Sequence, residues 1–243
     1  MRRYVAIFVT GWFAAASFAY DAFADDGVKT LGVGTSTLTA DGPMSVQVNM
    51  GECQFSIALK KGEHIKYNNP DLIFYRSNAR LTDQDIPFLH QVQTYSGYDW
   101  WFEKRGAVHV PWIGFMCENA SDFKWSPDNA QTDVPTGLQD IIDANSLRCP
   151  ADFIGGKWIR TQKSGASFRN LDVVGGQGFL VDETVTKKNS GGGSRFCFVH
   201  GGNVLIGVSG GAGLWPADDS KSNSLVNVLR DIKFKSDDVP GSQ

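Results

Sequence analysis

The sequence MSVQVNMGECQFSIAL, residues 44–59, alternates apolar and polar side chains on both sides of a single glycine. The apolar positions are Met44, Val46, Val48 and Met50 before the glycine, and Cys53, Phe55, Ile57 and Leu59 after it. A period of two places all of these side chains on one face of an extended chain. The stretch therefore predicts a β-hairpin with one buried face.

Further runs rich in β-branched and aromatic residues, bounded by Gly, Pro, Asn or Asp, predict more strands. They are Leu72–Tyr75, Trp100–Phe102, Val108–Met116, Lys157–Thr161, Gly178–Val185, Asn203–Ile206 and Arg230–Phe234. Apolar residues at helical spacing predict one short helix between Pro135 and Pro150 and another from about Ser222 to Leu229. We expect an α+β fold: mainly antiparallel β-sheet with two short helices, in a single domain stapled by disulfides.

The first 24 residues have the layout of a secretory signal peptide. Arg2 and Arg3 precede an apolar run, and Ala22-Phe23-Ala24 precedes Asp25. The apolar run has about 15 residues, fewer than the ~20 needed to span a bilayer. We expect export, cleavage between Ala24 and Asp25, and a periplasmic protein with no membrane insertion after processing.

The rest of the chain divides by composition. Residues 25–42 are rich in Gly, Thr and Ser and are expected to be a flexible lead, and residues 43–234 form the β-rich domain. The run KKNSGGGS, residues 187–194, is expected to be a flexible hairpin tip, because ordering three glycines costs much backbone entropy. Residues 235–243 are expected to be a disordered tail.

Four cysteines, Cys53, Cys117, Cys149 and Cys197, lie in the exported part, where thiols oxidise. Three pairings are possible. We favour Cys117 with Cys149, which would staple an irregular excursion, and Cys53 with Cys197, which would tie early and late strands together.

The charge balance argues against a nucleic-acid partner. The chain has 23 Lys and Arg and 26 Asp and Glu. Removing Arg2, Arg3 and Asp21 with the signal peptide leaves 21 basic and 25 acidic side chains. Phosphate binding requires clustered basic residues, and a mildly acidic surface does not supply them.

No catalytic or metal site stands out. Gly207-Val208-Ser209-Gly210-Gly211 has the spacing of a nucleophile elbow, but the glycines that follow are poor helix formers and every histidine precedes the serine. Cys197 and His200 are three residues apart, and in a strand such residues face opposite sides, so both could not reach one ion without a bend. We expect no catalytic residues, no metal and no cofactor, and a protein that is not an enzyme.

The stretch YSGYDWWFEKR, residues 95–105, is the candidate partner-binding surface. Trp100 and Trp101 are adjacent in a predicted strand, so one is exposed unless the sheet is covered on both faces. Exposed aromatic and Arg side chains dominate binding hot spots. The candidate residues are Tyr95, Tyr98, Trp100, Trp101 and Arg105. The alternative, that both tryptophans pack under a helix or loop, stays open.

Three segments together resemble a known family. They are Cys53-x-Phe55-x-Ile57-x-Leu59-x-x-Gly62-x-x-Ile65, the run from Phe196 to Gly210, and the run from Ser224 to Phe234. These segments resemble the periplasmic immunity proteins that neutralise lipase effectors of type VI secretion systems. The resemblance implies a protein that binds a toxic effector enzyme and occludes its substrate entrance.

Two other functions remain open. In a secreted ligand-binding module, Trp100, Trp101 or Trp125 would stack on a sugar ring or another flat apolar group. In an exported hydrolase, Ser209 would be the nucleophile. The oligomeric state is not fixed by the sequence.

Overall fold

The computed structural model describes residues 29–32, 36–68, 70–77, 81, 89–94, 97–102, 110–125, 136–161, 167–182, 193–210, 215, 221 and 224–235. The expected signal peptide, its cleavage point between Ala24 and Asp25, most of the expected hairpin tip and residues 236–243 lie outside these ranges. These predictions are therefore not tested by the structure.

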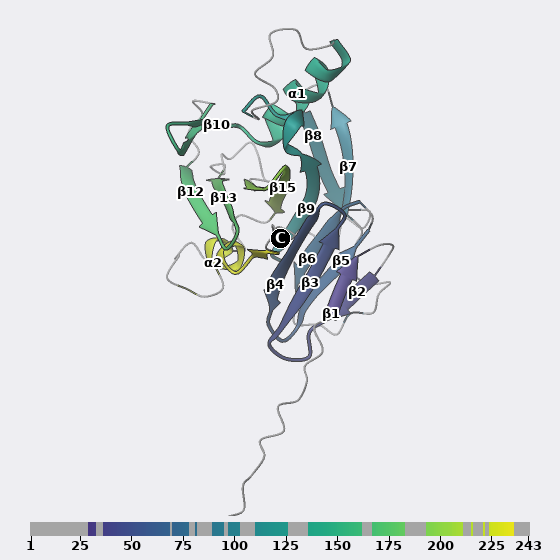
Figure 1. The fold of residues 1–243 in the computed structure, drawn as a ribbon. Coiled ribbons are helices and arrows are strands. Elements are labelled where there is room, and N and C mark those ends of the chain that lie inside the picture. The colour runs from purple at the N-terminus through teal and green to yellow at the C-terminus, as the bar shows by residue number, and fades with distance from the viewer. Residues whose placement is uncertain are drawn as a thin grey trace, which may run out of the picture.

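Two β-sheets make up most of the described chain (Figure 1). The larger has eight strands in the order β12 (Ser167–Val173), β13 (Gly176–Asp182), β14 (Ser194–His200), β15 (Asn203–Gly210), β9 (Trp112–Asn119), β6 (Leu72–Arg76), β5 (Glu63–Tyr67) and β2 (Ser36–Thr39). All of its neighbours pair antiparallel. The smaller sheet has the order β1 (Lys29–Gly32), β3 (Met44–Met50), β4 (Cys53–Leu59) and β16 (Lys233–Phe234), with only β1 and β3 parallel.

Two separate hairpins and three helical segments complete the described elements. The hairpins are β7 (Leu89–Thr94) with β8 (Gly97–Phe102), and β10 (Ala151–Ile154) with β11 (Lys157–Arg160). The helical segments are η2 (Ala120–Asp122), α1 (Thr136–Arg148) and α2 (Leu225–Arg230). The expected α+β fold of antiparallel sheet, two helices and disulfides is confirmed.

The main core lies between the two sheets. The predicted hairpin is present as β3 and β4, and its alternating apolar side chains are buried against the larger sheet. Phe115 on β9 contacts Phe55 on β4, with ring centroids 5.7 Å apart, and Phe196 on β14, at 5.6 Å. Cys53 and Cys117 form a disulfide that joins β4 to β9 and so links the sheets covalently. The two sheets form a sandwich.

The outer face of the larger sheet is covered as well. Side chains of β9, β13 and β15 on this face pack against Phe123, Cys149 and Trp158, which come from the segment around η2, α1 and the β10–β11 hairpin. Cys149, directly after α1, is disulfide-bonded to Cys197 on β14. The larger sheet is therefore buried on both faces along these strands.

Helix α2 and strand β16 close one side of the sandwich. The Ser224 hydroxyl caps the helix by accepting from the Asn227 N–H at 3.3 Å. The helix buries its apolar side chains in the main core. Strand β16 pairs with β4, and the Phe234 N–H also donates to the Val174 carbonyl beside β12, at 2.9 Å. The C-terminal segment thereby bridges the two sheets.

The expected disulfide pairing was wrong. The bonds are Cys53–Cys117 and Cys149–Cys197, not Cys117–Cys149 and Cys53–Cys197. The reason is the strand alternation itself: Phe196 and Phe198 on β14 belong to the core between the sheets, so Cys197 between them belongs to the opposite face. Cys53 faces the core between the sheets and therefore cannot reach Cys197.

Three boundaries also need correction. The expected flexible lead contains β1 and β2 at residues 29–32 and 36–39, each hydrogen-bonded to an edge of a sheet. The expected closing strand over 230–234 is shorter, because α2 continues to Arg230 and only Lys233–Phe234 pair. Lys235, the first residue of the expected tail, is held by its N–H to the Gln54 carbonyl at 3.0 Å.

Candidate functional site

The β7–β8 hairpin carries the predicted partner-binding residues. Tyr98, Trp100 and Trp101 lie on β8, opposite Gln93, Gln91 and His90 of β7. The hairpin forms a two-stranded sheet of its own and lies beside α1 (Figure 1). The side chains of β7 and β8 are outside the described part of the structure, as are Tyr95 and Arg105. The exposure of one tryptophan therefore stays a prediction.

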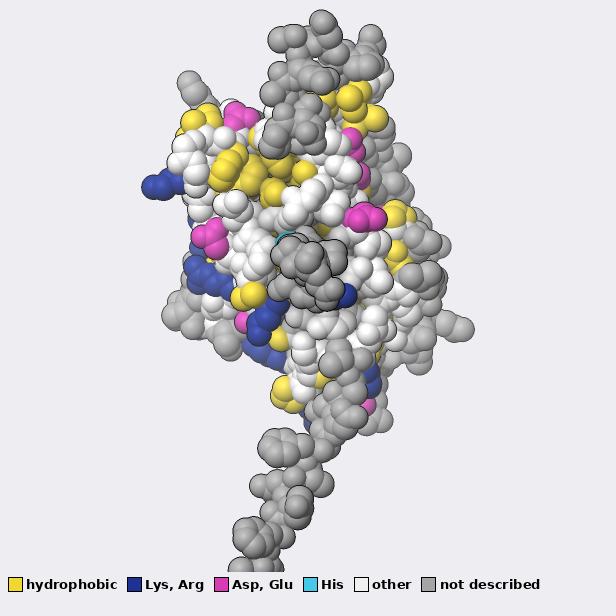
Figure 2. Space-filling model, in the orientation of Figure 1, with side chains coloured by type: hydrophobic (Ala, Val, Ile, Leu, Met, Phe, Trp, Pro, Cys, Tyr) yellow, Lys and Arg dark blue, Asp and Glu magenta, His cyan; other side chains and the backbone are white. Residues whose placement is uncertain are grey.

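A second surface at the same end of the molecule exposes large apolar side chains. Among the described residues, the exposed large hydrophobic side chains are Ile141 (46%), Phe153 (39%), Ile154 (59%), Ile159 (48%) and Val174 (59%). The first four lie on α1, β10 and β11, and we call them the apolar cap. Figure 2 shows hydrophobic side chains gathered on this upper part of the molecule. Exposed apolar side chains of this size, when grouped, mark interaction surfaces.

The local sequence explains why this hairpin exposes isoleucines. Gly155 and Gly156 have φ of 60° and 79°, the positive values that a tight two-residue hairpin turn needs. The register pairs Ile154 with Lys157 and Phe153 with Trp158. Because Trp158 is buried on the sheet, alternation sends Ile154 and Ile159 to the opposite face, into solvent.

A chain of aromatic rings lies beneath the hairpin, on the face opposite Ile154 and Ile159, and includes Phe153. The Trp158 ring contacts Phe179 of the sheet at 5.4 Å and Phe153 at 4.9 Å, measured between ring centroids. Trp125 meets the Trp158 ring edge-on at 5.0 Å and stacks on Phe123 at 4.7 Å. Trp125 therefore packs within the protein, and this weakens the idea that it stacks on a sugar.

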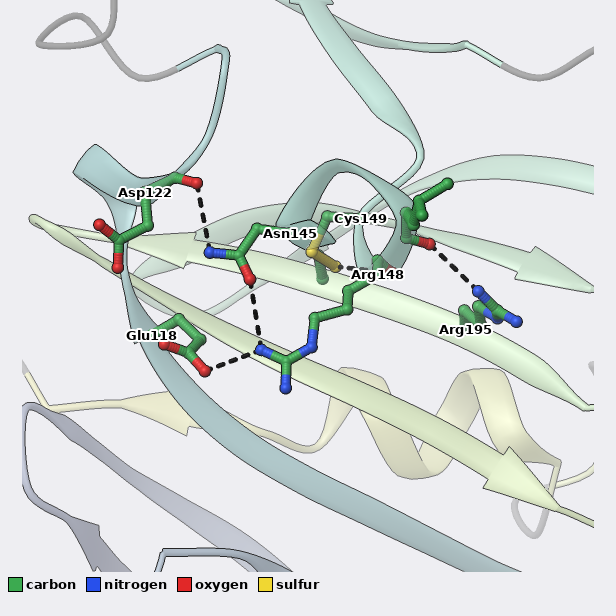
Figure 3. The surroundings of a disulfide bond; sticks show 8 residues. Glu118, Asp122, Asn145, Arg148, Cys149 and Arg195 are labelled. Carbon is green, nitrogen blue, oxygen red and sulfur yellow. Dashed lines mark hydrogen bonds and ion pairs between the residues drawn. A yellow bond between two sulfur atoms is a disulfide. The ribbon is translucent and has the colours of Figure 1, made fainter. Parts of the chain in front are cut away.

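The end of α1 is fixed to the larger sheet by a network around the second disulfide (Figure 3). Arg148 donates from Nη1 to Glu118 Oε1 of β9 at 2.7 Å and to Asn145 Oδ1 at 3.3 Å. Asn145 Nδ2 donates to the Asp122 carbonyl at 3.2 Å. The Arg148 side chain is only 3% exposed, so these partners compensate the cost of burying its charge.

Two further contacts attach the helix. Arg195 of β14 donates from Nη1 to the Leu147 carbonyl at 3.1 Å, which satisfies one of the carbonyls left open at the helix end. On the exposed side, Lys124 Nζ lies 3.1 Å from Asp143 Oδ1. The hydrogen bond from Lys124 lowers the pKa of Asp143 below its usual value. These contacts hold α1, which carries Ile141, in one position relative to the larger sheet.

The serine of the nucleophile-elbow pattern, Ser209, has a structural role in the sheet. Ser209 is buried in β15, and its hydroxyl donates to the Trp112 carbonyl at 3.0 Å. The flanking glycines are required by packing: a Cβ on Gly207 would clash with the Phe196 ring, and one on Gly210 with the Trp112 indole. A nucleophile elbow exposes its serine on a sharp turn, and Ser209 does not meet that condition.

The histidine and cysteine pair is likewise structural. Cys197 is consumed by its disulfide. His200 stacks on Phe234, with ring centroids 4.7 Å apart, and its Nδ1 hydrogen-bonds to the Gly175 carbonyl at 2.6 Å. Within the described residues, no group of three His, Cys, Asp or Glu side chains is placed to hold a metal ion.

The structure also shows a buried ion pair that the sequence patterns did not indicate. Glu63 on β5 accepts from Arg76 on β6 at 2.7 Å and from the Lys60 N–H at 2.7 Å. The Arg76 guanidinium lies 4.9 Å from the Trp215 ring centroid. This contact holds the Trp215 side chain against β6, which is a structural role. It lies away from the apolar cap.

Sequence reasoning missed the residues of the apolar cap itself. The signal was present: Gly155-Gly156 between apolar residues is a strong hairpin pattern. The hairpin face that meets solvent is decided by tertiary packing, because it depends on Trp158 docking against the sheet.

No protein-family model, curated protein or solved structure matches this chain. Within the described residues, no helix has the length and apolar character needed to cross a membrane.

Proposed function

We propose that this protein is an exported inhibitor of the immunity type, which binds a toxic effector enzyme in the periplasm and occludes its substrate entrance. The observation that carries the proposal is the apolar cap, where four large side chains are exposed on one helix and one hairpin. Singly exposed apolar residues are ordinary, but Ile154 and Ile159 share the outward face of one hairpin, and large apolar side chains exposed together are typical of a protein-binding surface.

The way the cap is held supports inhibition by binding. Its hairpin is attached through the Trp158 ring and the hydrogen bonds of Asn170, and the end of α1 before it through the Cys149–Cys197 disulfide and the hydrogen bond of Arg195. A surface that is already ordered loses less conformational entropy on association than a flexible one. The β7–β8 hairpin with Tyr98, Trp100 and Trp101 lies beside α1 and would extend the same binding surface.

The proposed location is the periplasm. Two disulfides with no free cysteine are compatible with an oxidising compartment. The first 24 residues would direct the chain there, so the mature N-terminus is expected to be Asp25. N-terminal sequencing of the protein from a periplasmic extract tests this step.

The resemblance in the early strand and the C-terminal third supports a type VI lipase effector as the partner. The test begins with genes adjacent to the one encoding this chain. If one encodes a lipase-like secreted enzyme, cells that export this enzyme are expected to survive only when they also export the present protein. The two proteins are expected to co-purify from the periplasm. Cell death in its presence, with no complex formed, would contradict the proposal.

A further inference from the structure

The β10–β11 hairpin has two backbone edges, and the structure occupies one of them with a side chain. On the β11 edge, the Trp158 N–H donates to Asn170 Oδ1 at 3.0 Å, and Asn170 Nδ2 donates to the Trp158 carbonyl at 3.3 Å. The amide of Asn170 thus takes the place of a neighbouring strand. The β11 edge is closed to further pairing.

The register shows where the backbone of β10 points. Phe153 lies directly opposite Trp158 in this antiparallel pair. Opposite residues either exchange both of their hydrogen bonds or direct both sets of polar groups outward. Because Trp158 directs its N–H and C=O outward to Asn170, Phe153 directs its own N–H and C=O outward at the edge of β10. Within the described residues, β11 is the only strand that pairs with β10.

The β7–β8 hairpin also has edges that pair with no further strand among the described residues, but it lies beside α1. The remaining sheet edges are already used or lie elsewhere. Strand β12 lies beside β11, to which its own Asn170 side chain is hydrogen-bonded, and the Val174 carbonyl directly after β12 accepts from the Phe234 N–H. Strand β16 bonds on both sides, to β4 and to Val174. Strands β1 and β2 lie at the far end of the molecule from β10 (Figure 1). The β10 edge is the one that the apolar cap presents.

The side chains along β10 specify what a neighbouring strand would carry. Ile154 is exposed, and Asp152 lies two positions away on the same face. Asp152 makes no ion pair with any described residue. Cross-strand neighbours favour apolar contact and opposite charge. A complementary strand therefore places an apolar residue opposite Ile154 and a basic residue opposite Asp152.

We propose that β10 is a strand-addition site: an extended segment of the partner protein pairs with the Phe153 backbone, with a basic residue opposite Asp152. Main-chain hydrogen bonds supply attachment in this binding mode, and alternate side chains supply specificity. The inference rests on the proposed function, because it states how the apolar cap engages its partner. The disulfide at Cys149, two residues before β10, holds the edge in place.

The test uses the mature protein and synthetic peptides. The probe is a blocked nonapeptide of alternating valine and threonine with one central lysine, and the control is the same peptide N-methylated at four consecutive central residues. The lysine peptide is expected to slow deuterium exchange of the Phe153 amide about tenfold or more, because the amide becomes hydrogen-bonded. The N-methylated peptide is expected to leave exchange unchanged.

A charge-swap variant tests the specificity. Asp152→Lys is expected to weaken binding of the lysine peptide about threefold, and a glutamate peptide is expected to recover that loss on the variant, in line with cross-strand pair energies. Val174→Lys introduces a lysine at an exposed position beside β16 and is expected to leave peptide affinity unchanged.

The inference is overturned if the Phe153 amide exchanges equally fast with and without the lysine peptide, or if the N-methylated peptide protects it as well. It is also overturned if protection rises with protein concentration alone, because the occupant is then a second copy of this chain. These results are separable from the proposed function. If the protein keeps cells alive against the effector but the Phe153 amide exchanges no more slowly in the complex, only the strand-addition inference is lost. If the peptide slows exchange of the Phe153 amide but the protein does not keep cells alive, only the immunity role is lost.

Discussion

Packing against aromatic side chains, and not chemistry at Ser209, explains why Gly207 and Gly210 on β15 are glycines. The Phe196 ring occupies the space where a Gly207 side chain would lie, and the Trp112 indole does the same at Gly210. Glycine in a strand often marks such close approach. The pattern that resembled a nucleophile elbow is thus a packing pattern in the centre of the larger sheet.

Substituting one of these glycines tests that explanation. Gly207→Ala is expected to lower the free energy of unfolding by about 1–3 kcal/mol, because an added methyl group overpacks the core. Gly202→Ala is the matched control, since a Cβ there meets no atom within 4 Å. Urea denaturation of both variants is the measurement. Equal stabilities for the two variants would contradict the packing account.

Asp143 gives a prediction with a defined pH dependence. Its pKa is lowered from 3.8 by the Lys124 hydrogen bond, so the pair contributes stability above that value, and the contribution is lost as the pH falls through the lowered folded pKa. Asp143→Asn is expected to cause a small loss of stability at pH 7, because the pair is exposed and screened. The difference from the wild type in thermal unfolding is expected to shrink as the pH falls below 3.8 and through the lowered folded pKa. A difference that does not change with pH would contradict the ion-pair origin.

At the scale of elements, the β10–β11 hairpin is the part assigned to binding. Ile154→Asp together with Ile159→Asp is expected to weaken effector binding by at least about 30-fold, the effect of losing a typical hot spot. The free energy of unfolding is expected to change by no more than about 0.5 kcal/mol, because both side chains are exposed.

Val174→Asp is the control for this pair of substitutions. Val174 is as exposed as Ile154, at 59%, but lies beside β16 and not in the apolar cap. Its substitution is expected to leave binding unchanged. Titration calorimetry with the purified effector compares the three proteins. Equal affinities for all of them would show that the cap does not bind.

Strand periodicity predicted the elements with long alternating runs and missed the short ones. Strands β3 and β4 follow the pattern of residues 44–59 along their whole length, and α1 ends before Pro150 as expected. Strands β1 and β2 have four residues each, and their Thr, Ser and Gly content resembles a loop. Their pairing with β3 and β5 is decided by tertiary contacts that composition does not record.

At the scale of the whole molecule, the two disulfides link different layers of the structure. Cys53–Cys117 links the sheets of the sandwich, and Cys149–Cys197 links the cap to the outer face. The alternation of Phe196, Cys197 and Phe198 put Cys197 on the face opposite the two phenylalanines, but which face meets Cys53 is set by the packing of the two sheets. Choosing between the pairings left open still required knowing that the segment after α1 crosses the outer face.

Removing each disulfide is expected to have a different structural consequence. By the chain-entropy estimate, either loss lowers stability by about 4 kcal/mol. Cys149→Ser with Cys197→Ser is expected to make residues 141–161 the first site of limited proteolysis. Cys53→Ser with Cys117→Ser is expected to lower the global melting temperature without directing cleavage to that segment. Mass mapping of the fragments distinguishes the two double variants. Identical fragment patterns would contradict separate structural roles for the two disulfides.

The central claim is that the end of the molecule formed by α1, β10 and β11 binds a partner protein. The most direct measurement is deuterium exchange of the mature protein, mapped by mass spectrometry, with and without its effector. The account predicts slower exchange in residues 141–160 and 89–102 and unchanged exchange in β1 and β2. Protection confined to β1, β2 or the turn at Val174, with the apolar cap unaffected, would contradict it.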